Sequence, residues 1–276
     1  MSFIAIIGSG PLGGAIAHKL AARDRVREVR LIDPEERIAQ GKALDICQSS
    51  PIENFSARVV GIGSLASVAG AGAVVIADAA TGKGEHTGEA GLALLRQIAA
   101  LETSAPIVFA GAAQRDLMAR AIGELHLAGS RTVGSAPFAL ESALRSLTGL
   151  SMDTSGVEIG ITVVGVPPHA AVVAWEEASV SGQPLTSHLP PHEIAALQAR
   201  LPGLWPPGPY ALASAASRVI EAIVNGSRRR FSCFVAAGRG GVGAMPVELG
   251  EDGVRRVLEP VLTGQERTRL ENAMNH

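Results

Sequence analysis

The chain begins with a glycine-rich turn between an apolar run and a helical segment. Residues 3–7 have the length and β-branched content of a buried parallel strand, and residues 11–23 have the apolar spacing of a helix. At the turn, Gly8 permits a sharp change of direction, Gly10 lets the backbone approach a phosphate group, and Gly13 lets helix and strand pack closely. A diphosphate would lie at the helix N-terminus, where free N–H groups and the dipole attract anions. This order of parts favours a dinucleotide site over a purely structural glycine turn.

An aspartate at the end of the next apolar run narrows the choice of nucleotide. Asp33 follows Leu31 and Ile32, and a carboxylate there can bind both ribose hydroxyls while it repels a 2′-phosphate. NAD is therefore favoured over NADP. We expect the cofactor to contact the turn and the neighbouring strand ends at Gly8, Gly10, Pro11, Leu12, Gly13, Asp33 and Ala79.

The composition points to a sheet covered by helices. Hydrophobic residues make up 47% of the 276 residues but aromatic residues only 3%, so the interior must consist mainly of Ala, Val, Leu and Ile, as in buried parallel strands. The formal net charge is −2 and no long basic block occurs. A nucleic-acid partner is therefore not expected, because binding to a phosphate backbone depends on many cations.

The cysteines and the N-terminus indicate a compartment. Cys47 and Cys233 lie far apart and match neither a disulfide framework nor a metal-ligand spacing. No charged region precedes the first apolar run, and that run is too short to span a membrane. We therefore expect a reduced cytoplasmic protein without a signal peptide, a membrane partner or a metal.

Strands and helices alternate as far as residue 134. Further strands are predicted at 57–61, 74–77, 106–110 and 131–134, and helices at 35–49, 91–101 and 115–127. This alternation predicts the α/β class, a doubly wound parallel sheet of the Rossmann type with its ligand at the carboxyl ends of the strands.

The pattern changes near residue 139. A helix at 140–147 leads into extended runs at 157–164 and 172–180, which are typical of antiparallel strands. Later segments predict a helix at 211–224, strands at 231–237 and 245–249, and a final helix at 263–274. We therefore predict two domains, a dinucleotide-binding domain at 1–138 and a mixed α+β substrate domain at 139–276.

Several segments together resemble the NAD-dependent lactate/malate dehydrogenase family, and the malate branch more closely. They are residues 4–14 with Leu31-Ile32-Asp33, then Gln40-Gly41-Lys42-Ala43-Leu44-Asp45-Ile46 and Ser49-Ser50-Pro51. The likeness extends over most of the chain. It implies reversible hydride transfer between a 2-hydroxy acid and the nicotinamide ring, a small-molecule substrate, and a homodimer or homotetramer paired through helix 35–49.

The resemblance also suggests a catalytic pair. His169 follows the apolar run 161–166 at the place of the family's catalytic histidine, although the neighbouring glycines and aspartate are missing. Glu141 stands where the family has the aspartate that orients this histidine. An imidazole suits proton transfer near neutral pH, and a carboxylate stabilises its charged form. The alternative is a strand-end histidine and a solvated helix glutamate.

The arginines expected for the substrate are missing. Leu144 stands at the place of one of them, and Arg145 is turned by about 100° around the helix. In the loop after residue 77, Lys83 is a candidate for one cation, whereas Glu89 replaces another. Lys83, His86 and Arg145 form a possible substitute site, or they are ordinary polar residues. A dicarboxylate such as malate is therefore disfavoured, and a larger or less acidic hydroxy compound is an alternative.

Three functions remain open from the sequence. The first is an NAD-dependent oxidoreductase acting on a hydroxy or oxo compound. The second is a catalytically impaired relative that acts as an NAD-binding regulatory or scaffold protein. The third is a Rossmann fold that no longer binds a nucleotide.

Overall fold

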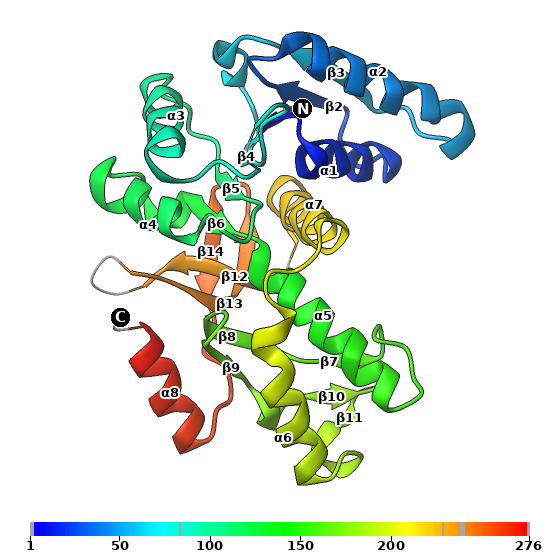
Figure 1. The fold of residues 1–276 in the computed structure, drawn as a ribbon, viewed down its shortest axis with the longest axis vertical. Helices are drawn as coiled ribbons and strands as arrows, with labels where there is room; N and C mark the ends of the chain where they lie inside the picture. Colours follow the sequence, from blue (N-terminus) through cyan, green and yellow to red (C-terminus); the bar gives the residue numbers. More distant parts are fainter. Residues whose placement is uncertain (1–2, 83, 228, 238–240, 275–276) are drawn as a thin grey trace.

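The computed structural model describes residues 3–82, 84–227, 229–237 and 241–274. Its first half contains six parallel strands in the spatial order β3-β2-β1-β4-β5-β6 (Figure 1). Their bounds are β1 Ile4–Ile7, β2 Glu28–Ile32, β3 Arg58–Ile62, β4 Ala73–Ile76, β5 Ile107–Phe109 and β6 Thr132–Gly134. β1 and β4 are buried along their whole length, as the apolar runs predict. The predicted doubly wound parallel sheet is confirmed.

Helices cover this sheet on both sides. α1 (Pro11–Ala22), α2 (Glu36–Glu53), α3 (Gly88–Ala100) and α4 (Arg115–Glu124) follow the strands as crossovers, with a short 3-10 helix η1 at Leu65–Val68. In Figure 1, α3 and α4 lie on one side of the row of strands, and α1 lies on the other with α7 (Pro209–Asn225). The strand ends that receive a ligand in such a fold are thus framed by the N-termini of α1 and α4.

The sheet continues into the second half of the chain. β12 (Arg230–Ala236) pairs antiparallel with β6, and β13 (Val242–Gly250), β8 (Val163–Val166) and β9 (Ala170–Val173) follow, while β14 (Gly253–Val257) pairs with β13. A separate small sheet contains β7 (Ile159–Gly160), β10 (Ser179–Val180) and β11 (Gln183–Pro184). The runs expected at 157–164 and 172–180 are therefore each divided between two sheets, and β14 was not predicted.

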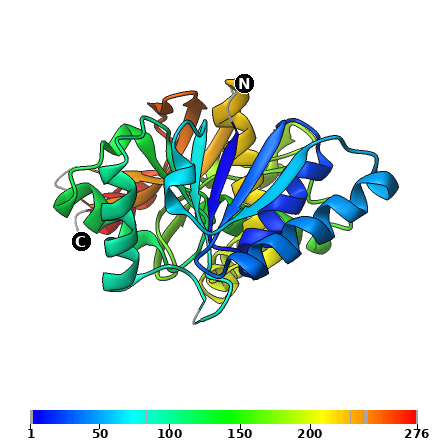
Figure 2. The ribbon, with the colours of Figure 1, turned by 90° about the horizontal axis from the view of Figure 1, so that it is seen from above.

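The remaining helices surround this second half. They are α5 (Ala136–Ser151), α6 (Pro191–Arg200) and α8 (Gly264–Met274), with 3-10 helices η2 (Gly129–Arg131), η3 (Trp175–Glu177), η4 (Leu185–Ser187) and η5 (Leu201–Leu204). α6 was not predicted. Figure 2, the view from above, shows how the strands of the first half fan out beside the second half. In the described part of the chain, no helix has both the length and the apolar character needed to cross a membrane.

Two hydrophobic cores lie along the molecule. The larger one combines the parallel strands with residues of α7, β12 and β13, and the smaller one joins α5 to the β7–β10 region and α6. The predicted division at 138/139 falls inside α5. The division into two domains stays a prediction, since the sheet and the larger core both include residues from each side of it.

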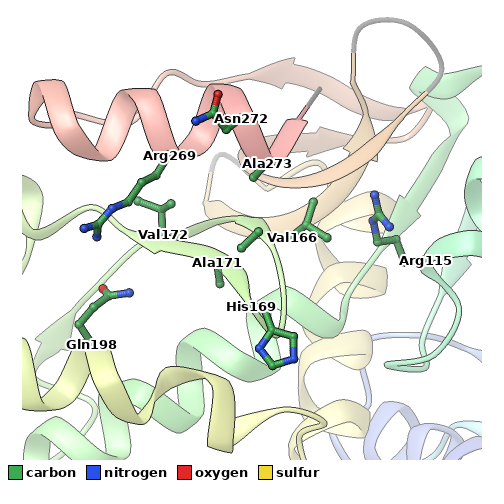
Figure 3. A pocket seen from close by; sticks show the side chains of 10 residues that line it. Arg115, Val166, His169, Ala171, Val172, Gln198, Arg269, Asn272 and Ala273 are labelled. Atoms are coloured by element: carbon green, nitrogen blue, oxygen red, sulfur yellow. The ribbon is translucent and has the colours of Figure 1, made fainter. Parts of the chain in front are cut away.

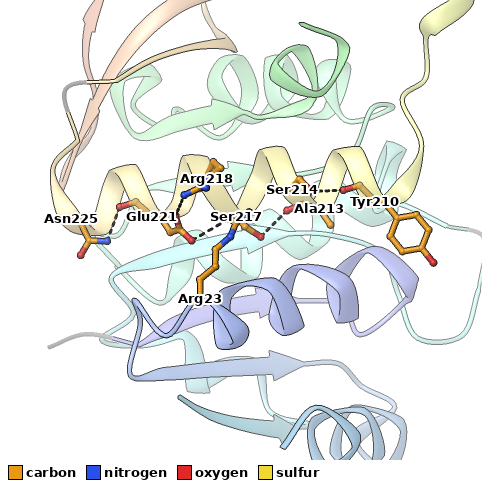
Figure 4. Close-up of polar contacts among 8 residues, drawn as sticks. All are labelled: Arg23, Tyr210, Ala213, Ser214, Ser217, Arg218, Glu221 and Asn225. Carbon is orange, nitrogen blue, oxygen red and sulfur yellow. Dashed lines mark hydrogen bonds and ion pairs between the residues drawn. The ribbon is translucent and has the colours of Figure 1, made fainter. Parts of the chain in front are cut away.

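An ion cluster joins α7 to α1 (Figure 4). The Glu221 carboxylate accepts hydrogen bonds from Arg23 at 3.1 Å and from Arg218 at 3.1 Å, and Glu221 is 5% exposed. Ser217 donates to the Ala213 carbonyl one turn earlier on the same helix at 2.7 Å. Because a buried carboxylate needs such partners, this cluster fixes α7 against the first half of the chain.

Candidate active site

The glycine turn has the geometry that a dinucleotide requires. Gly8 has a φ of +101° and donates to the Ile32 carbonyl at 2.8 Å, which joins the ends of β1 and β2. A side chain on Gly13 would collide with the Gly8 carbonyl oxygen, so only glycine permits this contact between α1 and the turn. α1 begins at Pro11, with Gly10 as its cap residue and no side-chain cap. The backbone thus has the tight turn predicted at Gly8 and the close helix–strand packing predicted at Gly13, while the approach of a phosphate group at Gly10 stays a prediction.

Asp33 lies at the carboxyl end of β2, as predicted. It is 2% exposed, and its carboxylate accepts backbone N–H bonds from Ser9 at 2.9 Å, Ala80 at 2.8 Å and Glu35 at 2.9 Å. Burial raises the pKa of this carboxyl, but the hydrogen bonds outweigh burial and the pKa lies below its ordinary value. Asp33 is therefore an ionised acceptor beside the turn, where a ribose hydroxyl would compete with backbone donors.

The sequence interpretation missed Asp78, which lies two residues beyond the end of β4. Its Oδ2 accepts from the Leu12 N–H at 3.0 Å and its Oδ1 from the Gly13 N–H at 2.8 Å. The side chain is buried, with 6% exposure. These two donors belong to the first turn of α1, where a diphosphate would bind. Its position directly after a strand of the ligand-binding edge was a signal that could have drawn attention to it.

The loop after β4 turns back over the strand ends. Glu85 accepts from the Ala112 N–H at 2.9 Å and the Ala113 N–H at 2.7 Å, directly after β5. The neighbouring His86 is half-buried, and burial lowers its pKa although Asp33 and Asp78 raise it. Of the predicted substrate cations, His86 therefore faces the nucleotide edge, and Lys83 lies outside the described residues.

Glu141 is buried between α5 and β12. Its Oε2 accepts from the Ser232 hydroxyl at 2.6 Å, and its Oε1 lies 4.0 Å from Arg145. Burial raises the pKa of Glu141 to about 7, against the opposing effects of Ser232 and Arg145. It lines a cavity of about 260 Å³ together with Glu177 and Arg230. Glu141 is not the solvated helix residue of the alternative interpretation.

His169 lies between β8 and β9 and is exposed. It borders a cavity of about 530 Å³ (Figure 3), whose other lining residues are Arg115, Val166, Ala170, Ala171, Val172, Gln198, Arg269, Asn272 and Ala273. In the described part of the chain, neither a hydrogen bond nor an ion pair joins His169 to Glu141. The structure therefore does not bring the predicted catalytic pair into contact, because the Glu141 carboxylate is directed to Ser232 instead.

The two described members of the predicted cationic cluster, Arg145 and His86, lie in different surroundings. Arg145 lies beside Glu141 and donates to the Val157 carbonyl at 3.4 Å, whereas His86 lies at the nucleotide edge. Leu144, at the place of a family arginine, is fully buried. A cation that the sequence interpretation missed, Arg115, borders the His169 cavity instead. Arg115 is the first residue of α4. The sequence did not indicate it as a site residue, because the start of a helix does not show which cavity its side chain borders.

Three kinds of comparison identify similar proteins. Residues 3–119 match the family model described as lactate/malate dehydrogenase, NAD binding domain. A malate dehydrogenase from Chloroherpeton thalassium is 28% identical over 294 residues, which covers 99% of this chain and 95% of that protein. One from Chlorobium phaeobacteroides is 29% identical over 295 residues, with 98% and 94% covered.

Solved structures share the fold. Malate dehydrogenase from Salinibacter ruber superposes with a TM-score of 0.86 at 22% identity, covering 99% of this chain and 94% of that one. Lactate dehydrogenase from Cryptosporidium parvum, complexed with lactic acid and nicotinamide adenine dinucleotide, gives a TM-score of 0.86 at 22% identity, with 99% and 95% covered.

Fold and glycine turn define a Rossmann-type dinucleotide-binding protein with a second α/β region. Residues 3–119 are similar to the NAD binding domain of lactate/malate dehydrogenases, and NAD is the cofactor of the domain that they match, while the malate dehydrogenases align with nearly the whole chain. Gly8, Gly10, Gly13 and Asp33 fit this cofactor. The Asp78 carboxylate, as it lies, does not, because it takes the two N–H groups that a diphosphate would use.

Proposed function

We propose that this protein is an NAD-dependent oxidoreductase of the malate/lactate dehydrogenase type that interconverts a hydroxy and an oxo compound, with His169 as its proton donor and acceptor. The observation that carries the proposal is the exposed His169 on a cavity of about 530 Å³ that two arginines, Arg115 and Arg269, also line.

Each half of the site has its own task. The turn at Gly8, Gly10 and Gly13 would hold the cofactor's diphosphate, and Asp33 its ribose. When bound, NAD accepts or supplies the hydride. His169 takes the proton from the substrate hydroxyl during oxidation and returns it to the carbonyl oxygen during reduction, a role for which imidazole groups are suited near neutral pH.

The cavity favours a substrate with one anionic group. Arg115 is fixed by its Nε bond to the Val242 carbonyl at 2.7 Å and by Asp116 at 3.2 Å, so its guanidinium is held in place for a carboxylate. Arg269 is exposed on α8. Leu144 is buried and does not line this cavity. A second carboxylate would have only the solvent-exposed Arg269 as its partner, and an exposed ion pair contributes little. A hydroxy or oxo acid larger than malate, with a single carboxylate, fits best.

Steady-state assays test this proposal. Purified protein would be assayed with NADH and a panel of 2-oxo acids, and with NAD and the matching 2-hydroxy acids. We expect turnover with a monocarboxylate, and a loss of about 100- to 10,000-fold in His169→Ala, the range for removing a general acid–base group. His188→Ala, which changes another exposed histidine, should keep its activity. Absence of turnover at high enzyme concentration, or full activity in His169→Ala, would overturn the proposal.

A second candidate is an NAD-binding regulatory protein without catalysis. It is favoured by the Glu141 carboxylate, which binds Ser232 at 2.6 Å rather than an imidazole. A histidine without an orienting carboxylate is a weaker acid–base catalyst. Calorimetric titration separates the two functions: NADH binding that is retained in a protein with no turnover would favour regulation.

A further inference from the structure

The loop after β4 is fastened to the carboxyl edge of the sheet at both of its ends. The Asp78 carbonyl accepts from the Gly10 N–H at 2.9 Å, and Asp78 forms an isolated antiparallel bridge with Glu85. At the far end, the His86 N–H donates to the Ala77 carbonyl at 3.2 Å. The loop is therefore folded onto the place where a dinucleotide would lie across the strand ends.

The Asp78 side chain takes the anion-binding donors of α1. Its two carboxylate oxygens accept from the N–H groups of Leu12 and Gly13 at 3.0 and 2.8 Å, and the side chain is 6% exposed. Hydrogen bonds from N–H groups to a carboxylate are about twice as strong as those between neutral groups. To bind here, a diphosphate would have to replace the Asp78 carboxylate as the acceptor of these two hydrogen bonds.

The same carboxylate also fills the space above Gly10. A Cβ built on Gly10 would lie 2.5 Å from both the Asp78 Cγ and its Oδ2. Gly10 has no Cβ, and this leaves space in which a diphosphate could approach the backbone. The Asp78 side chain occupies that space. Asp78 in this position and a bound diphosphate exclude each other sterically as well as electrostatically.

A second carboxylate of the loop acts at the neighbouring strand. Glu85 accepts from the N–H groups of Ala112 and Ala113, and a side chain on Gly111 would collide with the Glu85 carboxylate. Both carboxylates of the loop therefore bind backbone donors that face the ligand edge, one after β1 and one after β5. The loop blocks the edge at two separate points.

The loop also has the means to move. Gly82, Gly84 and Gly88 have φ values of +142°, +91° and +59°, and a Cβ on any of them would meet no atom within 4 Å. Glycines with open surroundings tolerate large changes of backbone angle at little steric cost. Backbone changes at these glycines allow the Glu85 carboxylate to leave the strand ends. The Asp78 backbone is held by the Gly10 N–H at 2.9 Å, so its carboxylate leaves by rotation of the side chain.

We propose that Asp78 is a built-in competitor of the cofactor: it occupies the diphosphate position on α1, so that a dinucleotide binds only when this carboxylate is displaced. The inference rests on the proposed function, since it presumes that the dinucleotide enters at this turn. Asp78 then sets the affinity for NAD, and the free protein rests in a closed state.

Calorimetric titration of the full-length chain with NADH, ADP and adenosine tests the competition. We expect Asp78→Ala to bind NADH and ADP at least tenfold more tightly than wild type, because both ligands carry the diphosphate. Adenosine binding should change less than twofold, since adenosine has no phosphate. Asp252→Ala removes an equal charge from an exposed position in the turn between β13 and β14 and should leave all three affinities unchanged.

A second variant guards against a loss of folding, because Asp78 also satisfies donors at the start of α1. Asp78→Asn keeps the size of the side chain and should tighten ADP binding by a smaller factor than Asp78→Ala. In hydrogen exchange without ligand, the Leu12 and Gly13 amides should be less protected in Asp78→Ala than in wild type. Addition of ADP to Asp78→Ala should restore their protection.

The outcomes separate the two proposals. If wild type binds NADH and both Asp78 variants, correctly folded, bind NADH and ADP no more tightly, the competitor role is overturned while the proposed function stands. If the wild type and both Asp78 variants fail to bind NADH, the NAD-dependent function is overturned together with it. Equal gains for adenosine and ADP would also contradict the competitor role, because they would place the effect away from the diphosphate.

Discussion

The two halves of the molecule each bury a carboxylate, and the two carboxylates behave in opposite ways. Asp33, at a strand end of the nucleotide edge, receives three backbone N–H bonds, and its pKa is lowered despite burial. Glu141, between α5 and β12, receives one hydroxyl bond from Ser232, and burial raises its pKa to about 7. The pKa shift of each carboxyl depends on the balance between burial and the number of fixed donors.

The two regions differ in whether the backbone or side chains supply their polar groups. At the nucleotide edge, strand ends and the α1 N-terminus supply backbone donors whose positions the fold itself fixes. In the second half, the chemistry depends on side chains such as His169 and Glu141, whose directions depend on local packing. The first region is consequently organised for anions before any ligand arrives, and the second is not organised around its histidine.

The largest expected effect concerns the packing that holds the nucleotide edge. Gly13→Ala places a Cβ against the Gly8 carbonyl oxygen, a backbone atom that cannot yield without moving β1 or α1. We expect a loss of about 3 kcal/mol or more in the free energy of unfolding. Urea denaturation measures it.

The matched control is Gly123→Ala on α4. Gly123 is exposed, and a Cβ on it would meet no atom within 4 Å, so the exchange should stabilise the chain by up to about 1 kcal/mol through helix propensity. Equal changes in the free energy of unfolding for the two substitutions would contradict a role of the Gly13–Gly8 contact in stability.

This pair of glycines also shows what the sequence could predict. The parallel strands, the turn at Gly8 and the close packing at Gly13 were predictable because a strand, a glycine turn and a helix follow one another directly in the sequence. β14, with three exposed residues, and α6, which begins at Pro191 after Pro190, were missed because their polar or proline-rich sequences resemble loops.

The side-chain contacts across the fold were not predictable in the same way. Asp78 meets Leu12 across 66 positions of the chain, and Glu141 meets Ser232 across 91. Such distances leave no periodic pattern. The resemblance indicates Glu141 as the carboxylate that orients the histidine, but which way this carboxylate turns depends on the packing of α5 against β12.

The next largest effect tests Glu141 directly through pH. Its ordinary pKa of 4.5 rises to about 7 in the folded state, so the folded protein holds a proton that the unfolded chain releases. The stabilisation is complete below pH 4.5 and is lost as the pH rises to 7, by about 3 kcal/mol for a shift of this size. Glu141→Gln should remove this decline and make the protein more stable than wild type at pH 8.

Denaturant titrations between pH 5 and pH 8 measure this change. Glu271→Gln, which alters an exposed glutamate of α8, should follow the wild-type profile. A Glu141→Gln variant whose stability declines with pH as steeply as that of wild type would show that Glu141 is already ionised in the folded protein, like Asp33.

Asp33→Asn should destabilise the protein near neutral pH, whereas Glu141→Gln should stabilise it. The folded pKa of Asp33 lies below its ordinary value of 3.8, so its stabilisation is present above that pH and is lost as the pH falls through the folded value. We expect Asp33→Asn to destabilise the protein by about 2 kcal/mol at pH 7, since bonds from backbone N–H groups to a charged acceptor are replaced by weaker ones. The difference from wild type should shrink at pH 3 in the same titrations. A constant difference at both values would contradict an effect of charge.

The smallest expected effect on stability concerns the outer surface of the nucleotide half. α2 buries Ala39, Ala43 and Ile46 against its own sheet, while Leu44 and Ile52 are 59% and 87% exposed. Exposed apolar side chains on the helix that the family resemblance assigns to subunit pairing suggest a contact with a second copy. We expect Leu44→Asp combined with Ile52→Asp to convert an oligomer to a monomer in analytical ultracentrifugation. The free energy of unfolding of the monomer should change by less than about 0.5 kcal/mol, because neither side chain belongs to the core.

Leu150→Asp, at a site 80% exposed in the second half, is the control and should keep the oligomer. Loss of assembly in the control, or an unchanged oligomer in the α2 variant, would move the interface away from the nucleotide half.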